Sequence, residues 1–100
     1  MKTIVCKVHE VEIGNKLVVN IRGKAVVVFN VEERFYCIED ICSHDGGTVS
    51  DGEVDGCIIK CPRHGAKFDV RDGSAKSLPA TKSITSYQVS VIDSNLVIDI

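Results

Sequence analysis

Two short stretches of this chain, Cys42-Ser43-His44 and Cys61-Pro62-Arg63-His64, each bring a thiol and an imidazole close together. Each stretch can therefore offer one sulfur and one nitrogen ligand to a metal. Glycines follow both stretches, at positions 46, 47 and 65, and they favour tight turns in which the backbone approaches a bound group closely. We predict one metal centre held between two loops, with Cys42, His44, Cys61 and His64 as its ligands.

The mixed ligand set indicates a Rieske-type [2Fe–2S] centre, in which two cysteines bind one iron and two histidines bind the other. A diferric core with two sulfides is doubly positive, so four thiolates would make it a dianion. Two thiolates and two neutral imidazoles leave it uncharged, and a neutral centre accepts an electron more readily. Rieske potentials accordingly lie at roughly −150 to +300 mV, against about −400 mV for plant-type all-cysteine clusters.

Zinc is the alternative occupant of the same four residues, because two cysteines and two histidines are a common structural zinc set. Zinc fingers usually pair cysteine with cysteine and histidine with histidine, whereas each stretch of this chain mixes the two. The mixing favours the iron–sulfur interpretation over a zinc site or a site without metal. Analysis of iron and acid-labile sulfide distinguishes them.

Size and composition restrict the remaining possibilities. The chain has 100 residues, which predicts a single domain over residues 1–100, and a net charge of −2, which gives no indication of nucleic acid binding. The longest apolar runs, such as Ala25–Phe29, are too short to span a membrane. The N-terminal residues show no signal-peptide pattern. We expect a soluble cytoplasmic protein.

The distribution of β-branched and aromatic residues predicts an all-β fold. Strands are expected at 16–22, 25–31, 35–39, 57–60, 86–92 and 96–100. Gly23-Lys24 is the predicted turn of the first hairpin. We expect an antiparallel β-sandwich or barrel with a loop-rich, cluster-binding subdomain at about residues 41–72.

The remaining cysteines and the remaining histidine have ordinary interpretations. Five cysteines are an odd number, which argues against a disulfide framework. Cys6, Cys37 and Cys57 lie in apolar β-rich runs, so we expect them to be buried small hydrophobic residues. His9 lies in a polar stretch and is expected at the surface.

The order and spacing of the two pairs, C-x-H followed by C-x-x-H, resemble those of the Rieske family, as does the downstream Phe68-Asp69…Asp72-Gly73. The chain is most similar to the small ferredoxins of bacterial ring-hydroxylating dioxygenases. It also resembles archaeal Rieske ferredoxins and the small subunit of assimilatory nitrite reductase. The resemblance implies a non-catalytic one-electron carrier, a monomer, that carries one [2Fe–2S] cluster between a flavin reductase and a terminal oxygenase. A permanent subunit of a larger reductase is the alternative.

The chain departs from the high-potential branch of the family at four positions. That branch has a disulfide where this chain has Gly47 and Arg63, and it has hydroxyl-bearing residues where this chain has Ala66 and Phe68. Hydrogen bonds to cluster sulfur stabilise the reduced form. Their loss implies a potential near the low end of the Rieske range.

The charged residues near the two pairs do not decide which surface contacts a redox partner. The acidic residues of this region are Glu39, Asp40, Asp45, Asp51, Glu53 and Asp55. They are either solvated turn residues or a rim that attracts a basic partner, while Arg63 and Lys67 give the second pair the opposite sign. Ser77-Leu78-Pro79-Ala80 is either a loop that shields the cluster or an ordinary surface turn.

Overall fold

The computed structural model describes residues 1–42, 46–62, 65–78 and 82–100. The strands of this part of the chain are β1 (Lys2–Lys7), β2 (Lys16–Ile21), β3 (Lys24–Val31), β4 (Arg34–Glu39), β5 (Glu53–Asp55), β6 (Ile58–Lys60), β7 (Lys67–Asp69), β8 (Ser86–Tyr87), β9 (Val89–Ile92) and β10 (Asn95–Asp99). A single 3₁₀ turn, η1 (Val8–Glu10), follows β1. The predicted all-β class is confirmed. No helix in these ranges has the length and hydrophobicity needed to cross a bilayer.

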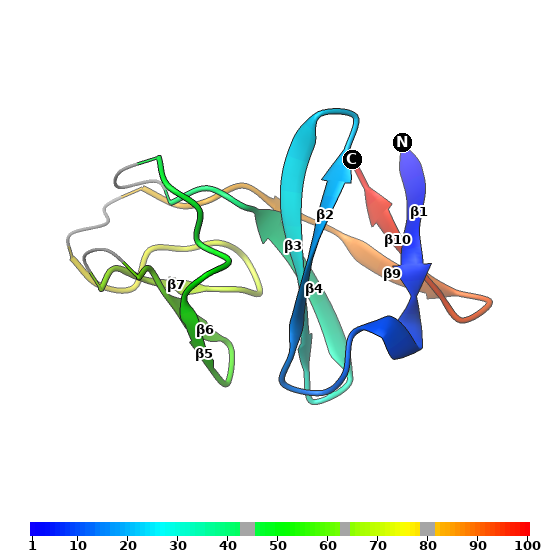
Figure 1. Cartoon of the computed structure of the whole chain (residues 1–100), viewed down its shortest axis with the longest axis horizontal. Helices are drawn as coiled ribbons and strands as arrows, with labels where there is room; N and C mark the ends of the chain where they lie inside the picture. The colour runs from blue at the N-terminus through cyan, green and yellow to red at the C-terminus, as the bar shows by residue number, and fades with distance from the viewer. Residues whose placement is uncertain (43–45, 63–64, 79–81) are drawn as a thin grey trace.

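The strands form three antiparallel sheets. Their orders are β1-β10-β9, β2-β3-β4-β8 and β5-β6-β7. In Figure 1 the four-stranded sheet lies in the middle, with the sheet that carries both termini on one side and β5–β7 with their loops on the other. The predicted ligand loops therefore belong to a layer of their own.

The central strand β3 explains how both outer layers attach. Val26 and Val28 pack into one hydrophobic cluster with Leu96 of β10, while Val27 and Phe29 pack into a second cluster on the β5–β7 side. Because side chains alternate between the two faces of a strand, a strand covered on both sides must be apolar throughout. The continuous run Ala25–Phe29 is the sequence signature of this double burial.

Three hairpins turn on residues with left-handed backbone. Arg22 and Gly23 have φ of 49° and 85° between β2 and β3, and Glu32-Glu33 and Asp93-Ser94 adopt similar angles in the other two turns. Two consecutive positive φ values define the turn that matches the twist of paired strands. The prediction of Gly23-Lys24 was wrong by one residue, because Lys24 pairs with Ile21 as the first residue of β3.

The sequence-based strand assignment also differs elsewhere. The expected strand at 86–92 is divided: β8 pairs with β4 and β9 pairs with β10, so the chain passes from one sheet to another at Gln88. Strands β1, β5 and β7 were not assigned. The last two have only three residues each and carry charged residues on their outward face, so they show no extended apolar alternation.

Candidate iron–sulfur site

Cys42 and Cys61 open two loops that lie on the same side of the central sheet. Cys42 follows β4 and Cys61 directly follows β6. Their side chains are 0% and 1% exposed, and both belong to the hydrophobic cluster that contains Phe29 and Phe68. All five cysteines of the chain are thiols. The structure therefore brings the two predicted thiolate ligands into one water-poor core.

Each of the two loops is closed by its own pair of backbone hydrogen bonds, and the two pairs are equivalent. Cys42 donates its N–H to the Gly47 carbonyl at 2.6 Å, and Gly46 donates its N–H to the Cys42 carbonyl at 2.8 Å. In the second loop, Cys61 donates to the Ala66 carbonyl at 2.7 Å and Gly65 donates to the Cys61 carbonyl at 3.1 Å. In both loops the residues four and five positions after the cysteine therefore bond to that cysteine's backbone. The histidine is two positions after the cysteine in the first loop and three positions after it in the second.

Glycine is required at one position of each loop. Gly46 and Gly65 both come four residues after a cysteine and have φ of 76° and 73°. That left-handed conformation costs a side-chain-bearing residue roughly 1 kcal/mol or more. The glycines predicted to mark turns therefore fix the shape of both loops.

Asp40 joins the two ends of the first loop. Its carboxylate accepts hydrogen bonds from the N–H of Val49 at 3.0 Å, the N–H of Ser50 at 2.8 Å and the hydroxyl of Ser50 at 2.8 Å. Sequence reasoning treated Asp40 as one of several acidic surface residues and missed this role. The local sequence carries no signal for this role, because the amides that Asp40 accepts lie nine and ten residues further along the chain.

Gly52 connects the first loop to the second. It donates its N–H to the Val49 carbonyl at 3.0 Å. A Cβ added at Gly52 would lie 1.9 Å from the Lys60 carbonyl oxygen, so only glycine allows this approach. The backbone at Gly52, just after the first loop, therefore packs closely against the backbone of Lys60, the residue before Cys61.

The segment after the second loop is fixed by Asp69 and Ser77. Asp69, 3% exposed, accepts hydrogen bonds from the Arg71 guanidinium at 2.7 and 3.0 Å and from the Arg71 N–H at 2.9 Å. The hydrogen bonds from Arg71 lower the pKa of the Asp69 carboxyl, which burial alone would raise. The Ser77 hydroxyl accepts the N–H of Lys67, so the segment that begins at Ser77 starts beside β7.

Half of the predicted ligand set lies in the described part of the chain. His44 and His64 fall outside it, as do Asp45, Arg63, Pro79 and Ala80. Within residues 1–42, 46–62, 65–78 and 82–100 no group of three or more His, Cys, Asp or Glu side chains could hold a metal. The two thiols, each followed within its own loop by a histidine, fit the donor set of a mixed-ligand cluster.

The other singled-out residues have structural positions. Cys37 is buried in the hydrophobic cluster that contains Val26, Val28 and Leu96, and burial raises the pKa of its thiol to about 12. Cys6 and Cys57 are only partly buried, so the expectation of full burial was wrong for both. Cys6 lies at the exposed edge of its sheet and Cys57 just before β6. His9 is exposed, as predicted.

Comparison with known proteins identifies the family. The sequence model of the Rieske [2Fe-2S] domain family matches residues 1–88 of this chain. The chain belongs to the Rieske [2Fe–2S] domain family. The ferredoxin component of the naphthalene 1,2-dioxygenase system of Pseudomonas aeruginosa is 34% identical over 92 residues, covering 92% of this chain and 88% of the relative. The 3-phenylpropionate/cinnamic acid dioxygenase ferredoxin subunit of Shigella boydii is 38% identical over 96 residues, covering 95% and 90%.

Solved structures agree with this assignment. The Sphingomonas yanoikuyae B1 ferredoxin has a TM-score of 0.92 and 34% identity, with 99% of this chain and 98% of that chain covered. A ferredoxin–oxygenase complex of carbazole 1,9a-dioxygenase also gives 0.92, with 32% identity and coverage of 97% and 91%. The predictions of a Rieske-type [2Fe–2S] cofactor, of an electron carrier and of a non-catalytic role are confirmed.

Proposed function

We propose that Cys42 and Cys61 bind one iron of the cluster, that His44 and His64 bind the other, and that the protein carries single electrons from a flavin reductase to a terminal oxygenase. The paired loops are the observation that supports this assignment most strongly. They present two buried thiols with matching backbone geometry, and each loop contains one of the histidines. The proposed domain is the whole chain, with the ligands in a subdomain at about residues 41–72.

When bound, the cluster supplies a centre that gains and loses one electron with little structural change. The chain's own residues determine the surroundings of that centre. Phe29 and Phe68 exclude water from the cysteine side, and Gly46 and Gly65 hold the two loops closed. Neutral imidazoles in place of thiolates keep the net charge of the centre low, which favours the reduced state.

Substitution tests the ligand assignment directly. Cys42→Ser, Cys61→Ser and His64→Ala should each abolish the Rieske visible spectrum, because each removes one ligand. Cys57→Ser is a matched control: its thiol packs against the same hydrophobic cluster but lies outside both loops. A Cys61→Ser protein with a wild-type spectrum and wild-type iron content would refute the assignment.

Two features of the chain's relatives favour a free carrier over a permanent subunit. The Pseudomonas aeruginosa relative is named a ferredoxin component and the Shigella boydii relative a ferredoxin subunit, and both are separate small chains of which this chain covers about nine-tenths. We therefore propose a cytoplasmic monomer that meets its partners through a small, transient interface, below roughly 1,200 Å². Sedimentation of the purified holoprotein should give the mass of one chain.

Reconstitution tests the electron-transfer role. The wild-type holoprotein should restore NADH-dependent product formation to a ring-hydroxylating dioxygenase system from which the ferredoxin has been omitted. The Cys61→Ser protein should not, because it lacks the cluster. A wild-type protein that neither takes an electron from the reductase nor passes one to the oxygenase would contradict the proposed function.

A further inference from the structure

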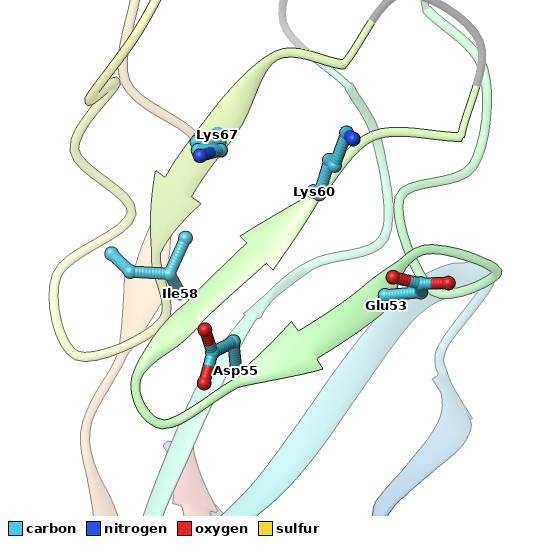
Figure 2. Close-up of a pocket in the computed structure, with 5 residues that line it drawn as sticks. All are labelled: Glu53, Asp55, Ile58, Lys60 and Lys67. Atoms are coloured by element: carbon cyan, nitrogen blue, oxygen red, sulfur yellow. The ribbon is translucent and has the colours of Figure 1, made fainter.

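The outward face of the small sheet β5-β6-β7 carries charges that the cluster site does not use. Figure 2 shows its side chains around a shallow depression of about 260 Å³. The lining residues are Glu53, Asp55, Ile58, Lys60 and Lys67. On the opposite face of the sheet Ile59 and Phe68 are buried in the core and Val54 is partly buried. Among the described residues, the face with the depression is therefore the more exposed side of this sheet.

Lys60 and Lys67 stand directly opposite each other on β6 and β7. Both are exposed, and within the described part of the chain neither has a carboxylate within ion-pair distance. Two like charges in a directly opposed cross-strand pair destabilise a sheet. The Lys60–Lys67 pairing is therefore unfavourable in itself, whereas Lys60 also stands opposite Glu53 on β5 in an opposite-charge pairing that stabilises the sheet.

The two lysines flank the second cysteine loop. Lys60 precedes Cys61 and Lys67 follows Ala66, so the antiparallel pair forms the base of that loop. The Lys60 side chain also lies over the loop, since its Cε would be 3.3 Å from a Cβ built on Gly65. A second hollow continues the face onto the loop itself, and it is lined by Asp51, Glu53, Lys60, Cys61 and Pro62.

We propose that this face, with Lys60 and Lys67 at its centre, is the docking surface for an electron-transfer protein that presents carboxylates at the contact. This inference rests on the proposed function and names the chemistry of the partner. The chain as a whole carries a net charge of −2, so an acidic partner is weakly repelled by the whole protein and attracted locally at this lysine pair. Attraction at one site and repulsion elsewhere orient an encounter complex.

The neighbouring strand makes the orientation more specific. Glu53 is aligned with Lys60 on β5, and Asp55 lies two residues further along the same strand. Figure 2 shows both carboxylates on the same face as the lysines. They repel a partner's carboxylates that move across the sheet and so direct the contact toward Cys61. The edge of the second loop then faces the partner.

Two one-electron oxidants of opposite charge test the sign of this surface. The reduced holoprotein passes its electron either to ferricyanide, giving ferrocyanide, or to hexaammineruthenium(III), giving hexaammineruthenium(II). At low ionic strength, Lys60→Gln/Lys67→Gln should slow the ferricyanide reaction at least about threefold and should not slow the ruthenium reaction. The difference should vanish at high salt, because exposed charges are screened over about 10 Å at 0.1 M.

A matched variant controls for the change in net charge. Lys2→Gln/Lys16→Gln removes the same two charges from exposed positions on β1 and β2, away from the cysteine loops. It should leave both rates within about 1.5-fold of wild type, and every variant should keep the wild-type cluster spectrum. Equal ferricyanide rates for the two lysine double variants would overturn the proposal.

Electron transfer to the oxygenase in the reconstituted dioxygenase system is the second test of this docking surface. Lys60→Gln/Lys67→Gln should lower electron transfer to the oxygenase at low salt by at least threefold relative to the control variant. A faster rate for this variant, with Glu53→Gln/Asp55→Asn slower, would mean a basic partner and would also overturn the proposal. Failure of the wild-type protein itself to carry electrons would instead refute the proposed function.

Discussion

Removal of the Asp40 carboxylate should destabilise the holoprotein and speed the loss of its cluster. In Asp40→Ala the N–H groups of Val49 and Ser50 and the Ser50 hydroxyl lose their acceptor. Val49 and Ser50 are buried, so water replaces that acceptor poorly. The three hydrogen bonds by which Asp40 joins the two ends of the first loop are then lost.

The magnitude follows from the three bonds. Hydrogen bonds to a charged group contribute about 1.5–3 kcal/mol each, and bonds that share one carboxylate do not add fully. Asp40 is only partly buried, so we take a total below the sum of three such bonds, about 3 kcal/mol. For a domain of this size that corresponds to a fall of roughly 12–24 °C in the melting temperature.

The assay is thermal loss of the cluster's visible absorbance at one fixed scan rate, compared with Asp51→Ala. Asp51 lies in the same segment but is exposed, and among the described residues it accepts the Thr48 hydroxyl alone, so its removal should cost within about 0.5 kcal/mol. Asp40→Asn keeps an acceptor oxygen and should fall between the two. If Asp40→Ala and Asp51→Ala lose the cluster at the same temperature, Asp40 does not hold the loop.

Three further predictions concern the segments around the second loop. Gly52→Ala should destabilise the protein by at least about 2 kcal/mol in denaturant titration, because its Cβ would meet the Lys60 carbonyl, and a loss below about 0.5 kcal/mol would contradict this. Asp69 has a lowered pKa, so its pairing with Arg71 stabilises the fold above the unfolded-state pKa and is lost as the pH falls through the folded value. Wild-type stability should therefore fall below about pH 4, and in Asp69→Asn the fall should be shallower; parallel pH profiles would argue against it. Voltammetry should place the wild-type potential at about −150 mV, and Ala66→Ser should raise it, whereas a wild-type value of +200 mV or more would refute the argument from missing hydroxyls.

Much of this fold could be predicted because its determinants are local. The alternation and β-branching of residues 16–39 predicted the central sheet, and the run Ala25–Phe29 reflects burial on both faces of β3. The chemistry of the cysteine–histidine pairs predicted the cofactor, since few centres use that mixture at that spacing.

The parts that were missed depend on contacts between distant segments. The division of residues 86–92 at Gln88 depends on which sheet each half joins, and no local pattern in the chain encodes that choice. The role of Asp40 depends on amides nine and ten residues away, and the role of Gly52 on a carbonyl in another strand. The sequence shows an aspartate and a glycine at these two positions, but it does not show which backbone groups they contact.

The central claim is that His44 and His64 bind the second iron of the cluster, and detection of histidine nitrogen ligands tests it most directly. The chain has three histidines, so pulsed EPR on the reduced protein with ¹⁵N-labelled histidine can assign every candidate. We predict two strongly coupled histidine nitrogens, unchanged in His9→Ala and reduced in number or lost in His64→Ala. A reduced wild-type protein without histidine nitrogen coupling would contradict the assignment of one thiolate and one imidazole to each loop.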